Sequence, residues 1–126
     1  MNIEEFKAKW LEIFVAGIPK KDIDRYVFDY GDNTIWHLFS WELLPEDEYL
    51  TGVAAKREFD SVNKQGAKYI IEFQDEEILR DLTPELSTAA GMDKMIEVYT
   101  VGKDFSWTYI KTHELVCGPY FCYRKK

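Results

Sequence analysis

The chain has 126 residues, of which 46% are apolar and 16% aromatic, with glycine and proline at ordinary levels. This length and composition are typical of one compact domain, so residues 1–126 are expected to form a single globular domain. Because 23 acidic side chains outnumber 16 basic ones and the formal net charge is −7, neither nucleic acid nor an anionic membrane is an expected partner.

The N-terminus and the cysteines indicate a cytosolic protein. Residues 1–5 lack the positive flank and apolar run of a signal peptide, and no stretch approaches the roughly 18 apolar residues of a membrane span. Cys117 and Cys122 are expected to be reduced, because a reducing compartment disfavours disulfides and two cysteines without further ligands do not make a zinc site. We expect no metal and no cofactor.

The first third of the chain predicts two helical segments and a strand. Apolar residues at helical spacing predict an amphipathic helix over residues 3–15, and Pro19 can open a second, short helical segment. A turn is predicted over residues 29–33. The β-branched and aromatic residues that follow predict a strand over 34–41, covered on both faces.

The middle of the chain predicts a crossover. Thr51 is a plausible N-cap for a helix over about 52–63, where apolar residues recur on one face. Residues 68–73 then predict a second strand. A helix that joins two strands is long enough for a crossover connection, so the strand over 34–41 and the strand over 68–73 are expected to be parallel.

The last part of the chain predicts short helices and then strands. One short helix is expected after Asp75, and another is opened by Thr83-Pro84 and closed by Gly91. Three strands are expected to follow, over residues 95–101, 105–111 and 120–124. Together these elements predict an α+β fold, in which N-terminal and crossover helices pack on a mixed or mostly antiparallel sheet of about five strands.

Carboxylates follow both of the first two predicted strands. If these strands are parallel, eight carboxylates lie at one edge of the sheet, which is where ligands of open α/β sheets tend to lie. This acidic rim consists of Glu42, Glu46, Asp47, Glu48, Glu72, Asp75, Glu76 and Glu77. Such a cluster invites a basic protein surface or a cation. If the strands are antiparallel, the two groups separate and become ordinary solvated surface.

Aromatic residues alternate along the strand predicted over 105–111. The side chains of Phe105, Trp107 and Tyr109 are expected on one face of the strand. Those of Ser106, Thr108 and Ile110 are expected on the other face. Such a row either lines a binding groove or packs under helices, and we prefer the core interpretation. Trp107 and Tyr109 are kept as members of a candidate functional motif.

The segment Thr112-His113-Glu114 follows in a predicted loop. His113 could act as an acid or base near neutral pH with Glu114 orienting it, but the preferred interpretation is that Thr112 caps a turn and His113 bonds backbone. If His37 met His113 and Glu114, the three would form a two-histidine, one-carboxylate metal set, although nothing in their spacing requires this. No catalytic residue is assigned, because no nucleophile–base pair or phosphate loop is recognisable.

Six segments of the sequence form a recognisable set: WHLFSW at 36–41, LTGVA at 50–54, FD at 59–60, WTY at 107–109, THE at 112–114 and GPYF at 118–121. With these segments the chain resembles a known family of small bacterial proteins, grouped as domain of unknown function 4275. The resemblance implies a cytosolic protein of Firmicute-type bacteria. It carries no established activity, so it assigns no catalytic role to these positions.

Two classes of function follow. The first is a protein-interaction module, whose sharpest form is an antitoxin-like or immunity protein that uses its acidic rim to block the basic active site of a toxin. The second is a small metal-dependent hydrolase that uses His113 and Glu114, joined by His37 if that residue lies beside them. Small size, net acidity and the lack of catalytic motifs favour the first class, with a basic protein as partner. The sequence leaves the oligomeric state open.

Overall fold

The computed structural model describes residues 3–15, 18–23, 48–71, 79–95, 97–112 and 118–124. The turn over 29–33, the strand over 34–41 and the helix after Asp75 lie outside these residues and stay predictions. So does the parallel pairing of the strand over 34–41. Within the described residues, no helix is long and apolar enough to cross a membrane.

Six strands form one sheet within the described part of the chain. They are β1 (Leu50–Thr51), β2 (Lys68–Ile71), β3 (Arg80–Asp81), β4 (Val98–Val101), β5 (Trp107–Lys111) and β6 (Tyr120–Tyr123). The strand order is β1-β6-β5-β4-β2-β3, and each of these neighbouring pairs is antiparallel. The predicted α+β fold with a mostly antiparallel sheet is confirmed.

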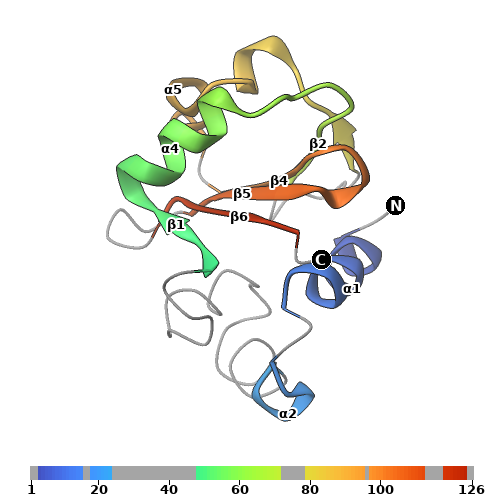
Figure 1. Cartoon of the computed structure of the whole chain (residues 1–126). Coiled ribbons are helices and arrows are strands. Elements are labelled where there is room, and N and C mark those ends of the chain that lie inside the picture. Colours follow the sequence, from blue (N-terminus) through green and yellow to red (C-terminus); the bar gives the residue numbers. More distant parts are fainter. Residues whose placement is uncertain are drawn as a thin grey trace.

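Helices cover both faces of this sheet (Figure 1). On one face lies α1 (Ile3–Phe14), which α2 (Lys20–Ile23) follows in the chain. The other face is covered by α4 (Gly52–Ser61), the 3-10 helix η3 (Pro84–Leu86) and α5 (Ala89–Met92). The sheet therefore carries one hydrophobic core on each face.

The core under α1 confirms the amphipathic helix predicted at the N-terminus. Phe6, Trp10 and Phe14 recur every four residues, and each is at most 1% exposed. The indole nitrogen of Trp10 donates to Thr108 Oγ1 at 2.9 Å, and the Thr108 hydroxyl donates to the carbonyl oxygen of Thr100 at 2.9 Å. These two bonds tie α1 to the centre of the sheet, because Thr100 and Thr108 lie on the neighbouring strands β4 and β5.

The core on the opposite face is centred on Phe59 of α4. Its ring stacks on Tyr109 of β5, with ring centroids 4.2 Å apart and planes 10° apart, and meets Trp107 edge-on at 5.8 Å. Ala55, one helical turn before Phe59, is also fully buried, as the predicted apolar stripe requires. Thr51 occupies the predicted N-cap position of α4, but its side chain makes no capping hydrogen bond.

The helix α4 makes a crossover over three strands. In the sheet, β1 and β2 are separated by β6, β5 and β4, so four antiparallel steps lead from one to the other. An even number of reversals gives β1 and β2 the same direction. The unit β1–α4–β2 therefore spans most of the sheet. The helix predicted over about 52–63 is confirmed as α4, whereas its predicted crossover from the strand over 34–41 stays a prediction.

The alternation predicted for the aromatic row is wrong at Phe105. This residue ends a 3-10 helix, η4 (Lys103–Phe105), and β5 begins only at Trp107. Asp104 and Phe105 both have left-handed backbone conformations, with φ of 56° and 55°, which reverse the strand alternation at this point. As a result, the Phe105 ring packs against the ring of Phe6 in α1, with ring centroids 5.6 Å apart. It lies on the opposite face of the sheet from Trp107 and Tyr109.

The helix predicted from Thr83-Pro84 to Gly91 is two short helices. Thr83 and Pro84 open η3, whereas α5 has its own N-cap, Thr88, whose Oγ1 accepts from the Gly91 N–H at 3.1 Å. Gly91 therefore lies inside α5 and does not close it. A Cβ at this position would lie well inside van der Waals distance of the Glu85 carbonyl oxygen, so close packing of the two helices requires glycine.

Candidate functional site

Most of the site residues predicted from the sequence lie outside the described part of the chain. This holds for seven of the eight acidic-rim residues and for His37, His113 and Glu114, whose proposed roles stay predictions. Glu48, the remaining rim residue, is exposed and lies two residues before β1. Among the described residues, no group of three His, Cys, Asp or Glu side chains could hold a metal ion.

Trp107 and Tyr109 lie in the core between the sheet and α4. Trp107 is 3% exposed and stacks on Phe121 of β6, and Tyr109 is fully buried against Phe59. Burial, together with the negative charges of Asp93 and Asp60, raises the pKa of Tyr109 well above its usual range. These positions are those expected of an aromatic row that packs under helices.

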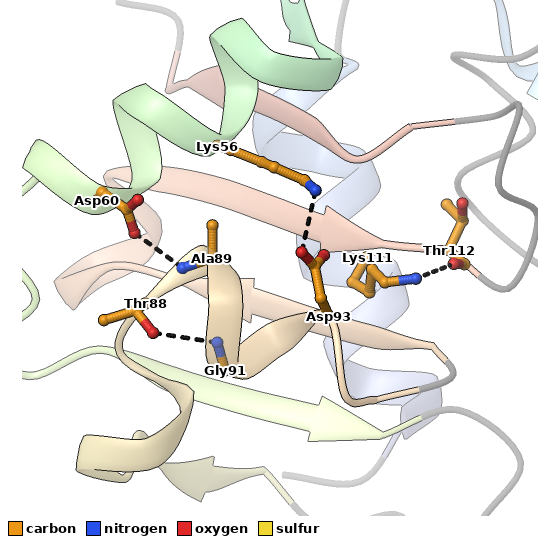
Figure 2. A network of polar contacts seen from close by, with 8 residues as sticks. All are labelled: Lys56, Asp60, Thr88, Ala89, Gly91, Asp93, Lys111 and Thr112. Carbon is orange, nitrogen blue, oxygen red and sulfur yellow. Dashed lines mark hydrogen bonds and ion pairs between the residues drawn. The ribbon is translucent and has the colours of Figure 1, made fainter.

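Polar contacts join α4 to α5 above this core (Figure 2). Lys56 Nζ lies 3.0 Å from Asp93 Oδ2, and the Ala89 N–H donates to Asp60 Oδ1 at 2.8 Å. Both carboxylates therefore fix the position of α5 on α4. Charged side chains in this region have a structural role.

A groove of about 290 Å³ lies where β1, α4 and β6 meet. Its lining combines carboxylates with apolar and aromatic groups: Glu48, Tyr49, Leu50, Glu58, Phe121, Cys122 and Tyr123. We call it the β6 groove. The side chains of Leu50 and Tyr123 are 37% and 51% exposed, and Val53, in the first turn of α4, is 64% exposed. Large apolar side chains are thus exposed at and next to a surface that also carries negative charge.

Two contacts orient Tyr123 in the β6 groove. Its hydroxyl donates to Glu58 Oε1, and its ring meets Phe121 edge-on with centroids 5.0 Å apart and planes 78° apart. Partial burial, the hydrogen bond to Glu58 and the charge of Glu58 raise the pKa of Tyr123 to about 12. The phenol is therefore neutral at physiological pH and remains a hydrogen-bond donor to the carboxylate.

The charge of Glu58 has no basic partner among the described residues. The one described hydrogen bond to its carboxylate comes from Tyr123, and none of the lysines and arginines that the structure describes lines the groove. Neighbours three and four positions away along α4 are alanine, serine and valine, so the helix supplies no ion pair. The β6 groove can thus accept a cationic group that also carries an apolar stem.

A second hollow, of about 340 Å³, is lined by Asn63, Gln65, Lys103 and Ser106. Its described lining is polar, and the Asn63 side chain is used locally, since Oδ1 accepts from the Gln65 N–H at 2.9 Å. The described lining of this hollow lacks the exposed apolar side chains that distinguish the β6 groove. The β6 groove is therefore the better candidate site.

Sequence reasoning did not find Leu50, Glu58 or Tyr123. These residues come together because β1 pairs with β6, with Leu50 opposite Phe121, a pairing between segments about 70 positions apart in the chain. Tyr123 was recognised only as part of the last strand. The one local signal is the pair of apolar residues Leu50 and Val53 next to Thr51, outside the buried stripe of α4.

The environment of Tyr123 can be tested by alkaline titration. The phenolate absorbance of Tyr123 is the part of the wild-type signal that Tyr123→Phe lacks. In the wild type this absorbance is expected to appear near pH 12. In Glu58→Gln it is expected to appear closer to about pH 10, the ordinary value for a tyrosine. Because the folded pKa is raised, the stabilising effect of Tyr123 is complete below pH 10 and is lost as the pH rises through 12. Circular dichroism at each pH confirms that the chain is folded, and an unchanged midpoint in Glu58→Gln would contradict the assignment.

The comparisons with known proteins identify a family. The family described as Domain of unknown function (DUF4275) matches residues 3–121, which is nearly the whole chain and includes β1, α4 and most of the β6 groove. No curated protein and no solved structure matches the chain. The resemblance seen in the sequence is confirmed, and the chain belongs to the DUF4275 family.

Proposed function

We propose that this protein is a protein-interaction module that binds a basic partner, as an antitoxin or immunity protein does. The observation that carries the proposal is the β6 groove, where the charge of Glu58 lies beside the exposed side chains of Leu50 and Tyr123 and has no basic partner among the residues that the structure describes. Exposed apolar groups beside charge are typical of interaction surfaces, and tyrosine is enriched in interfaces.

The overall charge supports the same proposal. A net charge of −7 attracts a basic protein over a long range and speeds the encounter at low salt. Glu48 belongs both to the acidic rim and to the lining of the β6 groove, and Glu46 and Asp47 directly precede it in the sequence. We therefore propose that the acidic rim, including Glu42 and the segment with Asp75, Glu76 and Glu77, extends the partner-binding surface.

The proposal is tested by capture on the immobilised protein from a lysate of its source organism, with bound proteins identified by mass spectrometry at low and at moderate salt. A basic protein held in stoichiometric amount at low salt and released at moderate salt is the expected result, because screening weakens the attraction between exposed charges. The absence of any retained basic protein at low salt would overturn the proposal.

Charge reversal then locates the surface. Two triple variants are each expected to weaken retention of the partner by roughly tenfold or more, since each reverses three charges that attract the partner. One variant combines Glu46→Lys, Asp47→Lys and Glu48→Lys. The other combines Asp75→Lys, Glu76→Lys and Glu77→Lys. The matched control reverses Glu5, Glu12 and Glu85, which are exposed and lie outside the groove lining, and changes the net charge equally.

His113→Ala separates this function from the hydrolase that the sequence also suggested. A partner-binding module should retain its partner at full strength in this variant. An enzyme would show the opposite pattern, in which the charge reversals have little effect and a measured hydrolytic activity depends on His113.

A further inference from the structure

We infer that the β6 groove recognises an arginine side chain of the basic partner, with Glu58 pairing with the guanidinium group and the ring of Tyr123 stacking on it. This inference rests on the proposed function, because it names the chemical group through which the partner is read. Glu58 supplies the charge, Tyr123 supplies the stacking surface, and Leu50 supplies an apolar contact for the stem of the arginine side chain.

Glu58 and Tyr123 are held in a fixed geometry. The Tyr123 hydroxyl bonds Glu58 Oε1, and the Phe121 ring supports the Tyr123 ring from its edge. The carboxylate is thus held beside an aromatic ring that is half exposed. Little side-chain freedom remains to be lost on binding, and such preorganisation strengthens a weak contact.

The β6 groove favours arginine over lysine. A guanidinium group is planar, stacks on aromatic faces and can donate two parallel hydrogen bonds to one carboxylate. An ammonium group is a strongly hydrated point charge, and it can satisfy the carboxylate without using the ring. Because the groove offers a carboxylate and an exposed ring together, it suits the guanidinium group better.

The stem of an arginine side chain also fits the β6 groove. Leu50, whose side chain is 37% exposed, supplies an apolar wall for the methylene stem, and Glu48 adds a second carboxylate at the groove. The volume of about 290 Å³ is at the lower end of the range for ligand pockets, which suits one long side chain and not a folded element.

The test uses the isotope-labelled protein and two five-residue peptides, capped at both ends, which carry one central arginine or one central lysine between serine and glycine. Amide resonances of Leu50, Glu58 and Phe121–Tyr123 are expected to shift on addition of the arginine peptide. The lysine peptide should bind about fivefold more weakly, because it forgoes one hydrogen bond and the stacking contact.

Variants assign the roles of the two residues. Glu58→Gln and Tyr123→Ala should each abolish the difference between the two peptides, whereas Tyr123→Phe, which keeps the ring, should preserve part of it. Glu85→Gln removes one negative charge at an exposed position on η3 and should bind both peptides as the wild type does. The amide spectrum of each variant confirms that the fold is retained.

Equal binding of the two peptides, shifts confined to another surface, or an unchanged preference in Glu58→Gln would each overturn the inference. These outcomes can be told apart from failure of the proposed function. If the wild type and Glu58→Gln both retain a basic partner equally, the module stands and the arginine site fails. If no basic protein is retained while the arginine peptide occupies the groove, the proposed function fails instead.

Discussion

Phe59→Ala is expected to lower the free energy of unfolding by about 3–5 kcal/mol, which is a large part of the stability of an ordinary domain. The side chain is fully buried, and its ring stacks on Tyr109 and meets Trp107 edge-on. Truncation would remove the apolar contact and leave a cavity between α4 and the sheet. It would also remove two aromatic pairs that contribute beyond their buried area.

Urea unfolding followed by tryptophan fluorescence measures this change, since Trp107 lies against the substituted residue. The control is Val53→Ala on the same helix, where the side chain is 64% exposed and the expected change is within about 0.5 kcal/mol. A loss below about 1 kcal/mol in Phe59→Ala would show that Phe59 does not hold α4 on the sheet, contrary to the packing described above.

Gly91→Ala is expected to destabilise the protein by about 3 kcal/mol, at the upper end of the range for overpacking. Helix propensity alone predicts the opposite sign, because alanine stabilises a helix interior by about 1 kcal/mol relative to glycine. The close approach of the Glu85 carbonyl oxygen decides the outcome, since a backbone atom cannot move aside as a flexible side chain can. The sign of the change is therefore the measurement that matters.

Thermal and urea unfolding of Gly91→Ala give this sign directly. Ala90→Ser is the matched control, because Ala90 is the preceding residue of α5, is exposed, and already carries a Cβ. If Gly91→Ala were more stable than the wild type, η3 and α5 would have to separate at little cost. That result would contradict the packing of these two helices.

The elements that the sequence predicted well are those with strong local patterns. The spacing of Phe6, Trp10 and Phe14 located α1, and the stripe through Ala55 and Phe59 located α4. The alternating and β-branched segments near the C-terminus located β4, β5 and β6 to within a few residues. These patterns depend on neighbours in the sequence, which is why they are readable without a structure.

Other features depend on contacts between distant segments. The two-residue strand β1 has no pattern of its own and exists because it pairs with β6. Gly91 was read as a helix terminator, its common local use, whereas its actual requirement comes from Glu85 on another helix. Phe105 was assigned to the wrong face, because two successive left-handed residues interrupt an otherwise regular alternation.

The candidate site was the hardest part to predict. The acidic rim was derived from charges that follow strands, and of its members the structure describes Glu48, at the β6 groove. The key pair of this groove, Glu58 and Tyr123, comes from a helix and a strand 65 positions apart. Neither residue stands out in the sequence, because each acquires its role only when β6 packs beside α4.

The strand order also sets the sequence of events during biosynthesis. The strand β6 lies between β1 and β5, yet it is translated after both of them. While the ribosome still holds residues 120–123, β6 is missing from the sheet. Among the described strands, β1 then has no partner, and β5 is paired only with β4. The nascent chain therefore exposes unpaired strand edges until residues 120–123 have left the ribosome, and the high sequence separation of these pairings favours slow folding.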